Sequence, residues 1–225
     1  MTLSLVGCCA RTGMLGAVVM SSSPAVAARC AWGRARVGAA CSQNITDPAL
    51  GIALLDRISA GAPAPDALAA ITAVAKDIEY RQLTVVDAFG RAASFSGERT
   101  LGRHADVTGA DCAAAGNLLA AESAPAAMAE AFAADPDGHL GDRLLAALVA
   151  GRDAGGEEGD VHSAGMIVYD DAAWPVTDLR VDWTPADPVA DLTALWDLWR
   201  PLADDYVTRA RDPRSAPSYG VPGDE

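Results

Sequence analysis

Threonine follows the first methionine of the chain, and this pair could give the mature protein a nucleophile at its amino terminus. A small second residue such as Thr2 permits removal of Met1. Thr2 would then carry a hydroxyl and a free α-amine, which together can act as nucleophile and base. An α-amine has an ordinary pKa of about 7.7–8.0, close to what a general base needs at neutral pH. Many ordinary proteins also begin with Met-Thr, so the pair by itself leaves both interpretations open.

A threonine nucleophile needs fixed hydrogen-bond donors where negative charge develops on the substrate, about 2.7–3.1 Å away. Polar residues at the ends of predicted strands are the candidates, and they are Ser21, Ser22, Gln43, Asn44 and Asn117. Each of them is equally compatible with an ordinary turn or cap role. If Thr2 is not the nucleophile, His162 and Ser163 are the next residues to test, because they lie at the start of a predicted strand.

Other familiar catalytic and metal-binding motifs are missing from the chain. It contains no P-loop, no G-x-S-x-G and no H-E-x-x-H sequence. The five cysteines include no C-x-x-C pair, which argues against a structural zinc site. We expect these cysteines to be buried, reduced thiols. The sequence therefore predicts neither a metal nor a cofactor.

The elements that must position these residues change in type along the chain. Alternating or small apolar residues predict strands over 2–6, 14–20, 25–32, 37–42, 83–87, 92–95 and 163–169, with a short extended piece from 174 to about 182. Helical spacing predicts helices over 48–60, 65–76, 123–134, 140–151 and 187–205. Strands and helices are segregated along the chain, which favours an α+β fold with mainly antiparallel sheets.

Length and composition indicate one globular domain. A chain of 225 residues predicts a single domain over residues 1–207, which includes the carboxyl-terminal helix. The tail over residues 208–225 is rich in proline, serine and glycine and is predicted to be disordered. Leu195, Trp196 and Trp199 form a large apolar face on the last helix, which favours a homodimer or a larger symmetric oligomer; packing of this face onto a sheet is the alternative.

Charge and targeting signals restrict the partners and the location. The formal net charge of −13 repels phosphates, so nucleic acid and anionic membrane surfaces are poor partners. No apolar run reaches the roughly 18–20 residues that a membrane span needs. The apolar stretch after Arg11 resembles a signal peptide only superficially, because Gly13 and Gly16 interrupt it and no basic segment precedes it. We therefore expect a cytoplasmic protein.

Several sequence blocks, in order along the chain, resemble the DUF1028 family. The first is Thr2-Leu3-Ser4-Leu5-Val6, and the others occupy 12–13, 15–19, 24–26, 32–35, 37–39, 47–51, 79–82, 86–88, 116–119, 128–132, 154–156, 178–182 and 187–188. Together they extend over roughly residues 2–200. Two segments depart from the family pattern. His162 stands where a glutamine is usual, and the two arginines that usually precede this position are absent; Ala115 stands where glutamine is frequent.

This family is assigned to the N-terminal-nucleophile (Ntn) hydrolase superfamily, and the resemblance implies its properties as expectations. It implies a four-layer α-β-β-α sandwich. It also implies that Thr2 is the nucleophile of an amidohydrolase that acts on a small amide or peptide-like substrate. The departures at His162 and Ala115 bear on substrate specificity. Two alternatives remain: a non-catalytic binding or assembly protein on the same fold, and a cyclohydrolase-like enzyme without a free amino-terminal nucleophile.

The identity of the catalytic base follows from the scarcity of lysine. Lys76 is the only lysine and lies near the end of a predicted outer helix, so we expect the α-amine of Thr2 to be the base. Cationic neighbours would lower the pKa of this amine, and Arg29, Arg34 and Arg36 are the candidates, whereas Asp47 would raise it. Activity is then expected to rise with pH through a single group between about 6.5 and 8.

Overall fold

Two antiparallel sheets face each other in this protein, for which a computed structural model describes residues 2–223. The six-stranded sheet has the order β10 (Thr177–Val181), β9 (Ser163–Tyr169), β2 (Leu15–Ser21), β1 (Thr2–Cys8), β8 (Cys112–Asn117) and β7 (Ala105–Gly109). The four-stranded sheet has the order β3 (Ala31–Arg34), β4 (Gly38–Asn44), β5 (Arg81–Asp87) and β6 (Ala92–Ser96). Each pair of neighbouring strands in residues 2–223 is antiparallel, which confirms the α+β class.

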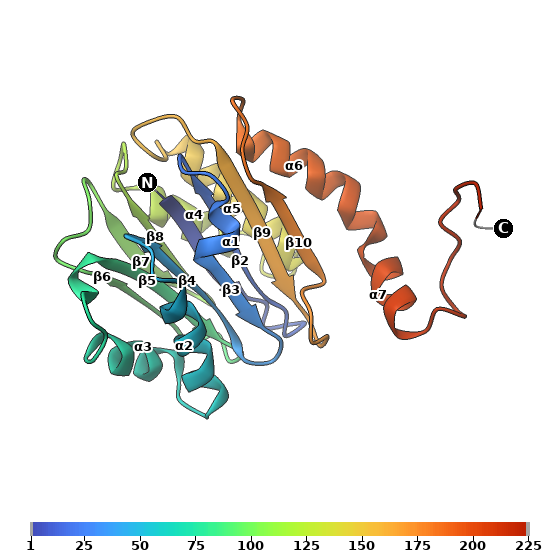
Figure 1. Ribbon diagram of the computed structural model, residues 1–225, viewed down its shortest axis with the longest axis horizontal. Helices are drawn as coiled ribbons and strands as arrows, with labels where there is room; N and C mark the ends of the chain where they lie inside the picture. Colours follow the sequence, from blue (N-terminus) through green and yellow to red (C-terminus); the bar gives the residue numbers. More distant parts are fainter. Residues whose placement is uncertain (1, 224–225) are drawn as a thin grey trace.

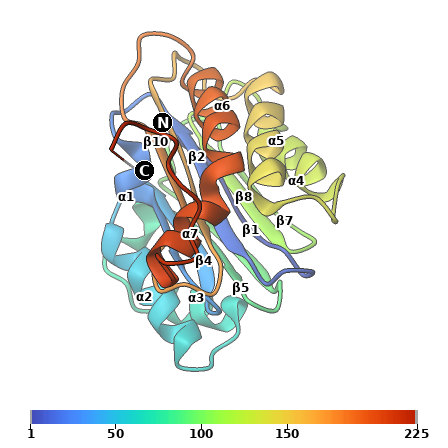
Figure 2. The same ribbon diagram turned by 90° about the vertical axis from the view of Figure 1, so that its right-hand side faces the viewer.

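Helices cover the outer faces of both sheets, as Figure 2 shows from the side. On the six-stranded sheet, α4 (Ala124–Ala133), α5 (Leu140–Asp153) and α6 (Pro188–Trp199) share an apolar cluster with the strands. On the four-stranded sheet, α2 (Pro48–Ser59) and α3 (Ala64–Thr72) do the same. A third cluster lies between the two sheets and includes Val6, Val19 and Val86. A short 3-10 helix, η1 (Ile78–Tyr80), precedes β5.

The central strand β1 is buried on both faces, and its residues alternate between the two neighbouring layers. Leu3 and Leu5 belong to the cluster with the helices, whereas Val6 lies in the cluster between the sheets. Ser4 also faces the second sheet, because its hydroxyl bonds to Gln43 of β4. Side chains two residues apart on a strand point the same way, so the side chain of Thr2 lies between the sheets.

Close packing of helices on β1 and β2 requires glycine at one paired position. Gly7 lies opposite Gly16 in the register of the two strands. A Cβ atom on Gly7 would lie 2.5 Å from Phe132 of α4, and one on Gly16 would lie 2.9 Å from Leu144 of α5. The missing side chains therefore let both helices approach the sheet closely at this pair.

Residues 25–32 do not form the single strand that the sequence predicts. Ala25 takes a left-handed conformation with φ 52°, and the chain then forms α1 (Val26–Cys30) before β3 begins. Val26, Ala27 and Cys30 pack against the inner side of β2 and β9. The alanine-rich segment has good helix propensity, and the apolar contacts are compatible with either structure. The strand prediction for this segment was wrong because burial by itself does not distinguish a short helix from a strand.

The hairpin of β7 and β8 is absent from the sequence prediction, although β8 lies directly beside β1. Its sequence Cys-Ala-Ala-Ala-Gly-Asn lacks the β-branched and aromatic residues that indicate strands. Every residue of β8 is buried. β1 and β7 lie on either side of β8, and the second sheet packs over one of its faces. Small side chains fit this crowded position.

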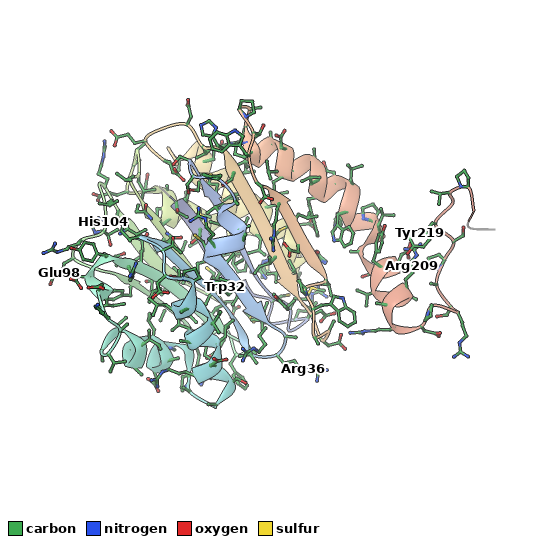
Figure 3. The ribbon with its side chains drawn as sticks, in the orientation of Figure 1. Trp32, Arg36, Glu98, His104, Arg209 and Tyr219 are labelled. Atoms are coloured by element: carbon green, nitrogen blue, oxygen red, sulfur yellow. The ribbon has the colours of Figure 1, made fainter. Side chains whose placement is uncertain are left out.

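The predicted helix over residues 187–205 is interrupted near Pro201. It consists of α6, the 3-10 helix η2 (Arg200–Leu202) and α7 (Ala203–Arg211). Proline has no N–H and cannot continue the hydrogen-bond pattern of an α-helix, which explains the break. The arm formed by α7 and the following residues extends away from the sheets in Figure 1. Its labelled side chains Arg209 and Tyr219 lie together in Figure 3, with the guanidinium 3.9 Å from the ring centre.

All five cysteines are buried and free, which confirms the prediction of reduced core thiols. The domain limit at residue 207 stays a prediction, and α7 continues past it to Arg211. In residues 2–223, every helix is too short or too polar to cross a membrane.

Candidate functional site

Four predicted site residues form a row across the six-stranded sheet at the start of β1. Thr2 lies directly opposite Asn117 of β8, and Ser21 of β2 lies opposite Ser163 of β9. The β1–β2 register pairs Leu3 with Met20, so the next pair places Ser21 beside Thr2. Residues opposite each other on antiparallel strands project from the same face. The row therefore lies on the face that looks toward the second sheet, and Thr2 is only 4% exposed.

A buried hydrogen-bond network connects this row to the second sheet. Ser4 donates to Gln43 Oε1 at 2.6 Å, and Gln43 Nε2 donates to Gln82 Oε1 at 2.8 Å and to the carbonyl of Ala115 at 3.1 Å. Asn117 Nδ2 donates to the same Gln82 oxygen at 3.1 Å. Gln43 thus has both N–H groups engaged, and Asn117 has one of its two N–H groups in this network. Gln82, which the sequence analysis did not select, connects the two sheets together with Gln43.

The serines of the row are held by the loop that leads from β2 into α1. Ser163 Oγ donates to the carbonyl of Ser23 at 2.6 Å, and the Ser21 and Ser23 hydroxyls lie 2.9 Å apart. Arg29 of α1 donates to Ser23 Oγ at 2.9 Å and to the carbonyl of Pro24 at 3.0 Å. These bonds hold Ser21 and Ser163 against the loop on this side of the row.

A buried carboxylate, Glu157, lies at the same end of the sheet and was not among the predicted site residues. Its backbone pairs with Leu119, just after β8, and its Oε2 accepts the N–H of Ser22, just after β2, at 3.1 Å. Glu157 is 7% exposed. Burial raises the pKa of the Glu157 carboxyl to about 7, and the bond from Ser22 opposes this rise. The glycine-rich segment 155–160 predicted only a loop. A carboxylate between glycines was the one signal in the sequence that could have marked Glu157 as a site residue.

The other predicted residues lie outside the row. Asn44 has a left-handed φ of 72°, donates to the carbonyl of Tyr80 at 2.6 Å and accepts the N–H of Leu101 at 3.2 Å. Ser22 contributes its backbone N–H to Glu157. His162 donates its backbone N–H to the carbonyl of Ser21, but its ring lies against Trp183, with centres 4.4 Å apart. Asn44 and the His162 ring therefore have their partners outside the row, whereas Ser22 contacts Glu157 beside it.

Most of the charged residues considered for the amine have partners away from the row, whereas Arg29 bonds to Ser23 and Pro24 beside it. Arg34 pairs with Asp56 at 2.8 Å, and Arg36 lies 3.9 Å from Asp171. Asp47 accepts the N–H of Ala49 and caps α2. Lys76 is exposed, beyond the end of α3. Glu157 is consequently the charged side chain that the structure adds to this end of the sheet.

Two cavities flank this end of the molecule. One, of about 390 Å³, is lined by Ile45, Tyr80, Arg81 and Leu101 next to Asn44. The other, of about 350 Å³, is lined by Arg152, Asp160, His162 and Asp187, among others. Within residues 2–223, no group of three or more histidine, cysteine, aspartate or glutamate side chains could hold a metal ion. Met1, whose removal the sequence predicts, lies outside the described residues.

This mixed α+β protein, with antiparallel sheets and a polar row at the start of its central strand, belongs to the family of unknown function DUF1028, whose model matches residues 2–192. It is similar to the crystal structure of protein SPO2555 from Silicibacter pomeroyi, with 32% identity, coverage of 93% of both chains and a TM-score of 0.83. A second similarity is to Anbu (ancestral beta-subunit) from Yersinia bercovieri, at 8% identity, 92% and 97% coverage and a TM-score of 0.43. No curated protein matches the chain.

Proposed function

We propose that this protein is an Ntn-type amidohydrolase with a four-layer α-β-β-α fold, in which Thr2 is the nucleophile once Met1 has been removed. One observation carries the proposal: Thr2 begins the central strand, and its side chain lies between the sheets in a row with Asn117 and Ser21. Helix packing on the outer face of each sheet supports the proposed layers. A small amide or peptide-like compound is the proposed substrate, and the cytoplasm is the proposed location.

The proposed reaction uses two groups of one residue. The α-amine of Thr2 accepts the proton of the Thr2 hydroxyl as Oγ forms a bond to the substrate carbonyl carbon. The resulting ammonium then gives this proton to the leaving amine as the amide C–N bond breaks. A water molecule attacks the ester in the second half, with the amine again as base, and releases the carboxylic acid and the free hydroxyl. The second N–H of Asn117 is the proposed donor to the developing oxyanion.

The first test is the covalent state of the amino terminus. We expect mass spectrometry of the protein isolated from its source to find Thr2 as the first residue, because the mechanism requires a free amine on that residue. The same preparation is then assayed with a panel of small amides and dipeptides. A protein that mostly retains Met1 would contradict the threonine mechanism, whatever the amide panel gives.

A non-catalytic binding or assembly protein on the same fold is the second candidate, and the burial of Thr2 favours it. An acylating β-lactone probe distinguishes the two functions. In a hydrolase, the probe forms an ester with Thr2 that peptide mapping locates, whereas a binding protein with an inaccessible Thr2 is not labelled. A cyclohydrolase-like enzyme without a free amino-terminal nucleophile would turn over a cyclic amide while retaining Met1.

The homodimer also stays a prediction, although the tryptophans that suggested it have partners within one protomer. Trp196 is 2% exposed and donates to Asp142, and Trp199 donates to Thr177. Leu198 of α6 and Leu202 of η2 are instead 69% and 44% exposed beside this helix. Equilibrium sedimentation at concentrations of about 1–10 μM, a range set by ordinary affinities, is expected to give twice the protomer mass of 23.0 kDa. A particle of the protomer mass would refute the dimer.

A further inference from the structure

The side chain of Glu157 crosses the start of β1 between the two neighbouring strands. Its backbone is attached beyond the end of β8, through the bridge with Leu119 and the bond from the N–H of Glu158 to the carbonyl of Leu118 at 2.9 Å. Its carboxylate reaches the N–H of Ser22, beyond the end of β2. Strand β1 lies between β8 and β2, and neighbouring strands are about 4.8 Å apart. The Glu157 side chain therefore extends across the position where β1 begins.

Two buried oxygen atoms at this position lack hydrogen-bond donors in the part of the chain that the structure describes. Glu157 Oε1 is one of them, and Asn117 Oδ1 is the other. Glu157 is 7% exposed and Asn117 is 1% exposed. Buried acceptors are almost always satisfied in folded proteins, so each of these oxygens indicates a missing donor. The Glu157 carboxylate lies on the β2 side of the start of β1, and Asn117 lies on its β8 side.

The charged and titratable groups of the surrounding elements are engaged elsewhere. Arg29 of α1 bonds to Ser23 and Pro24, and Arg152 of α5 pairs with Asp153 and Asp187. Arg103 pairs with Glu158, the His162 Nδ1 lies 2.9 Å from the carbonyl of Thr184, and the Cys30 thiol lies 3.6 Å from the Thr46 hydroxyl. Among residues 2–223, no cation forms an ion pair with Glu157.

We propose that Glu157 and Asn117 form a receptor for the α-ammonium group of mature Thr2, and that Glu157 sets the proton affinity of this amine. This inference rests on the proposed function. An ammonium group offers three N–H donors, which suit a carboxylate oxygen and an amide oxygen on opposite sides of the strand. Glu157 and Asn117 are positioning residues in this role, because they orient the amine that acts on the Thr2 hydroxyl.

The sign of the expected pH effect follows from the charge of Glu157. A carboxylate beside an amine favours the ammonium form and raises its pKa, so loss of the negative charge lowers that pKa. The amine and the carboxyl group titrate as a coupled pair, because burial brings the pKa of Glu157 into the same pH range, at about 7. The single titration predicted from the sequence is therefore expected to become two overlapping steps.

Glu157→Gln is the test, since glutamine can still accept the Ser22 N–H through its carbonyl oxygen. We expect the amine to titrate about one pH unit lower than in the wild type, in line with removal of a neighbouring opposite charge. Labelling of the amine by an acylating reagent, followed by peptide mass spectrometry from pH 5 to 9, measures this pKa without any substrate. Near and above pH 7, where Glu157 carries its charge, and below the wild-type midpoint, the variant should label up to about tenfold faster, the equivalent of one pH unit. The difference should shrink toward pH 5, where the Glu157 carboxyl becomes protonated.

Glu158→Gln is the matched control, because the Glu158 side chain is 60% exposed and pairs with Arg103 at the surface. It should leave the labelling profile unchanged, and Glu157→Asp should restore part of the wild-type midpoint by restoring the charge. If the rising limb of kcat/KM moves with the labelling midpoint, the amine is also the base. Equal midpoints in wild type and Glu157→Gln, with Thr2 as the first residue and activity intact, would overturn the receptor and leave the proposed function standing.

Discussion

Replacing Thr2 with alanine is expected to lower kcat by a factor of about 10³ or more, because no other group replaces the attacking hydroxyl. Thr2→Ser should retain part of the activity, since the hydroxyl and the amine remain on one residue. Thr2 is buried at the start of β1. The activity that Thr2→Ser loses therefore also measures how much the methyl group of Thr2 contributes to the packing of the row. Steady-state kinetics with the first substrate that the amide panel identifies give kcat for the wild type, Thr2→Ala and Thr2→Ser.

Thr12→Ala is the control for this experiment. Thr12 is exposed in the turn between β1 and β2, at the opposite end of β1 from Thr2. Its replacement should leave kcat unchanged. Full turnover by Thr2→Ala, with its amino terminus verified by mass spectrometry, would show that the nucleophile assignment is wrong. His162 and Ser163 would then be tested, although Ser163 is bonded to Ser23 and the His162 ring lies against Trp183.

Replacing Gln82 with leucine is expected to lower the free energy of unfolding by about 3 kcal/mol, the upper part of the range for buried polar groups left unsatisfied. Gln82 accepts from Gln43 and Asn117 and donates to the carbonyl of Gly116 at 3.0 Å. Leucine leaves these groups without their partner inside the protein, where water cannot replace it. Urea unfolding measures the effect as a lower midpoint with an unchanged slope.

Ser96→Ala tests whether position in the network matters more than the number of bonds. Ser96 accepts from Gln82 at 2.9 Å and donates to Asp106 at 2.6 Å, but it lies at the partly exposed border of the four-stranded sheet. Water can satisfy the groups that this variant exposes, so we expect a loss of about 1 kcal/mol or less. Equal losses for the two variants would show that the buried network does not hold the sheets together.

Local patterns in the sequence determined the elements whose signals lie within a few residues. Strand β9 occupies the predicted residues 163–169, because a run of large apolar residues follows a turn segment. The start of α2 was predictable because Asp47 caps it and Pro48 occupies its first turn. The position of Thr2 was also predictable in part, since an alternating strand at the amino terminus places residues 2 and 4 on one face.

Tertiary structure alone decided which residues surround Thr2. The alanine-rich β8 becomes a strand because β1 and β7 pair with it on either side, so no local signal places Asn117 opposite Thr2. Glu157 reaches the start of β1 from a loop 155 positions later in the chain, through contacts beyond the ends of β8 and β2. Chain segments meet across a sheet according to the order and register of its strands, and neither is encoded by the spacing of residues within one segment.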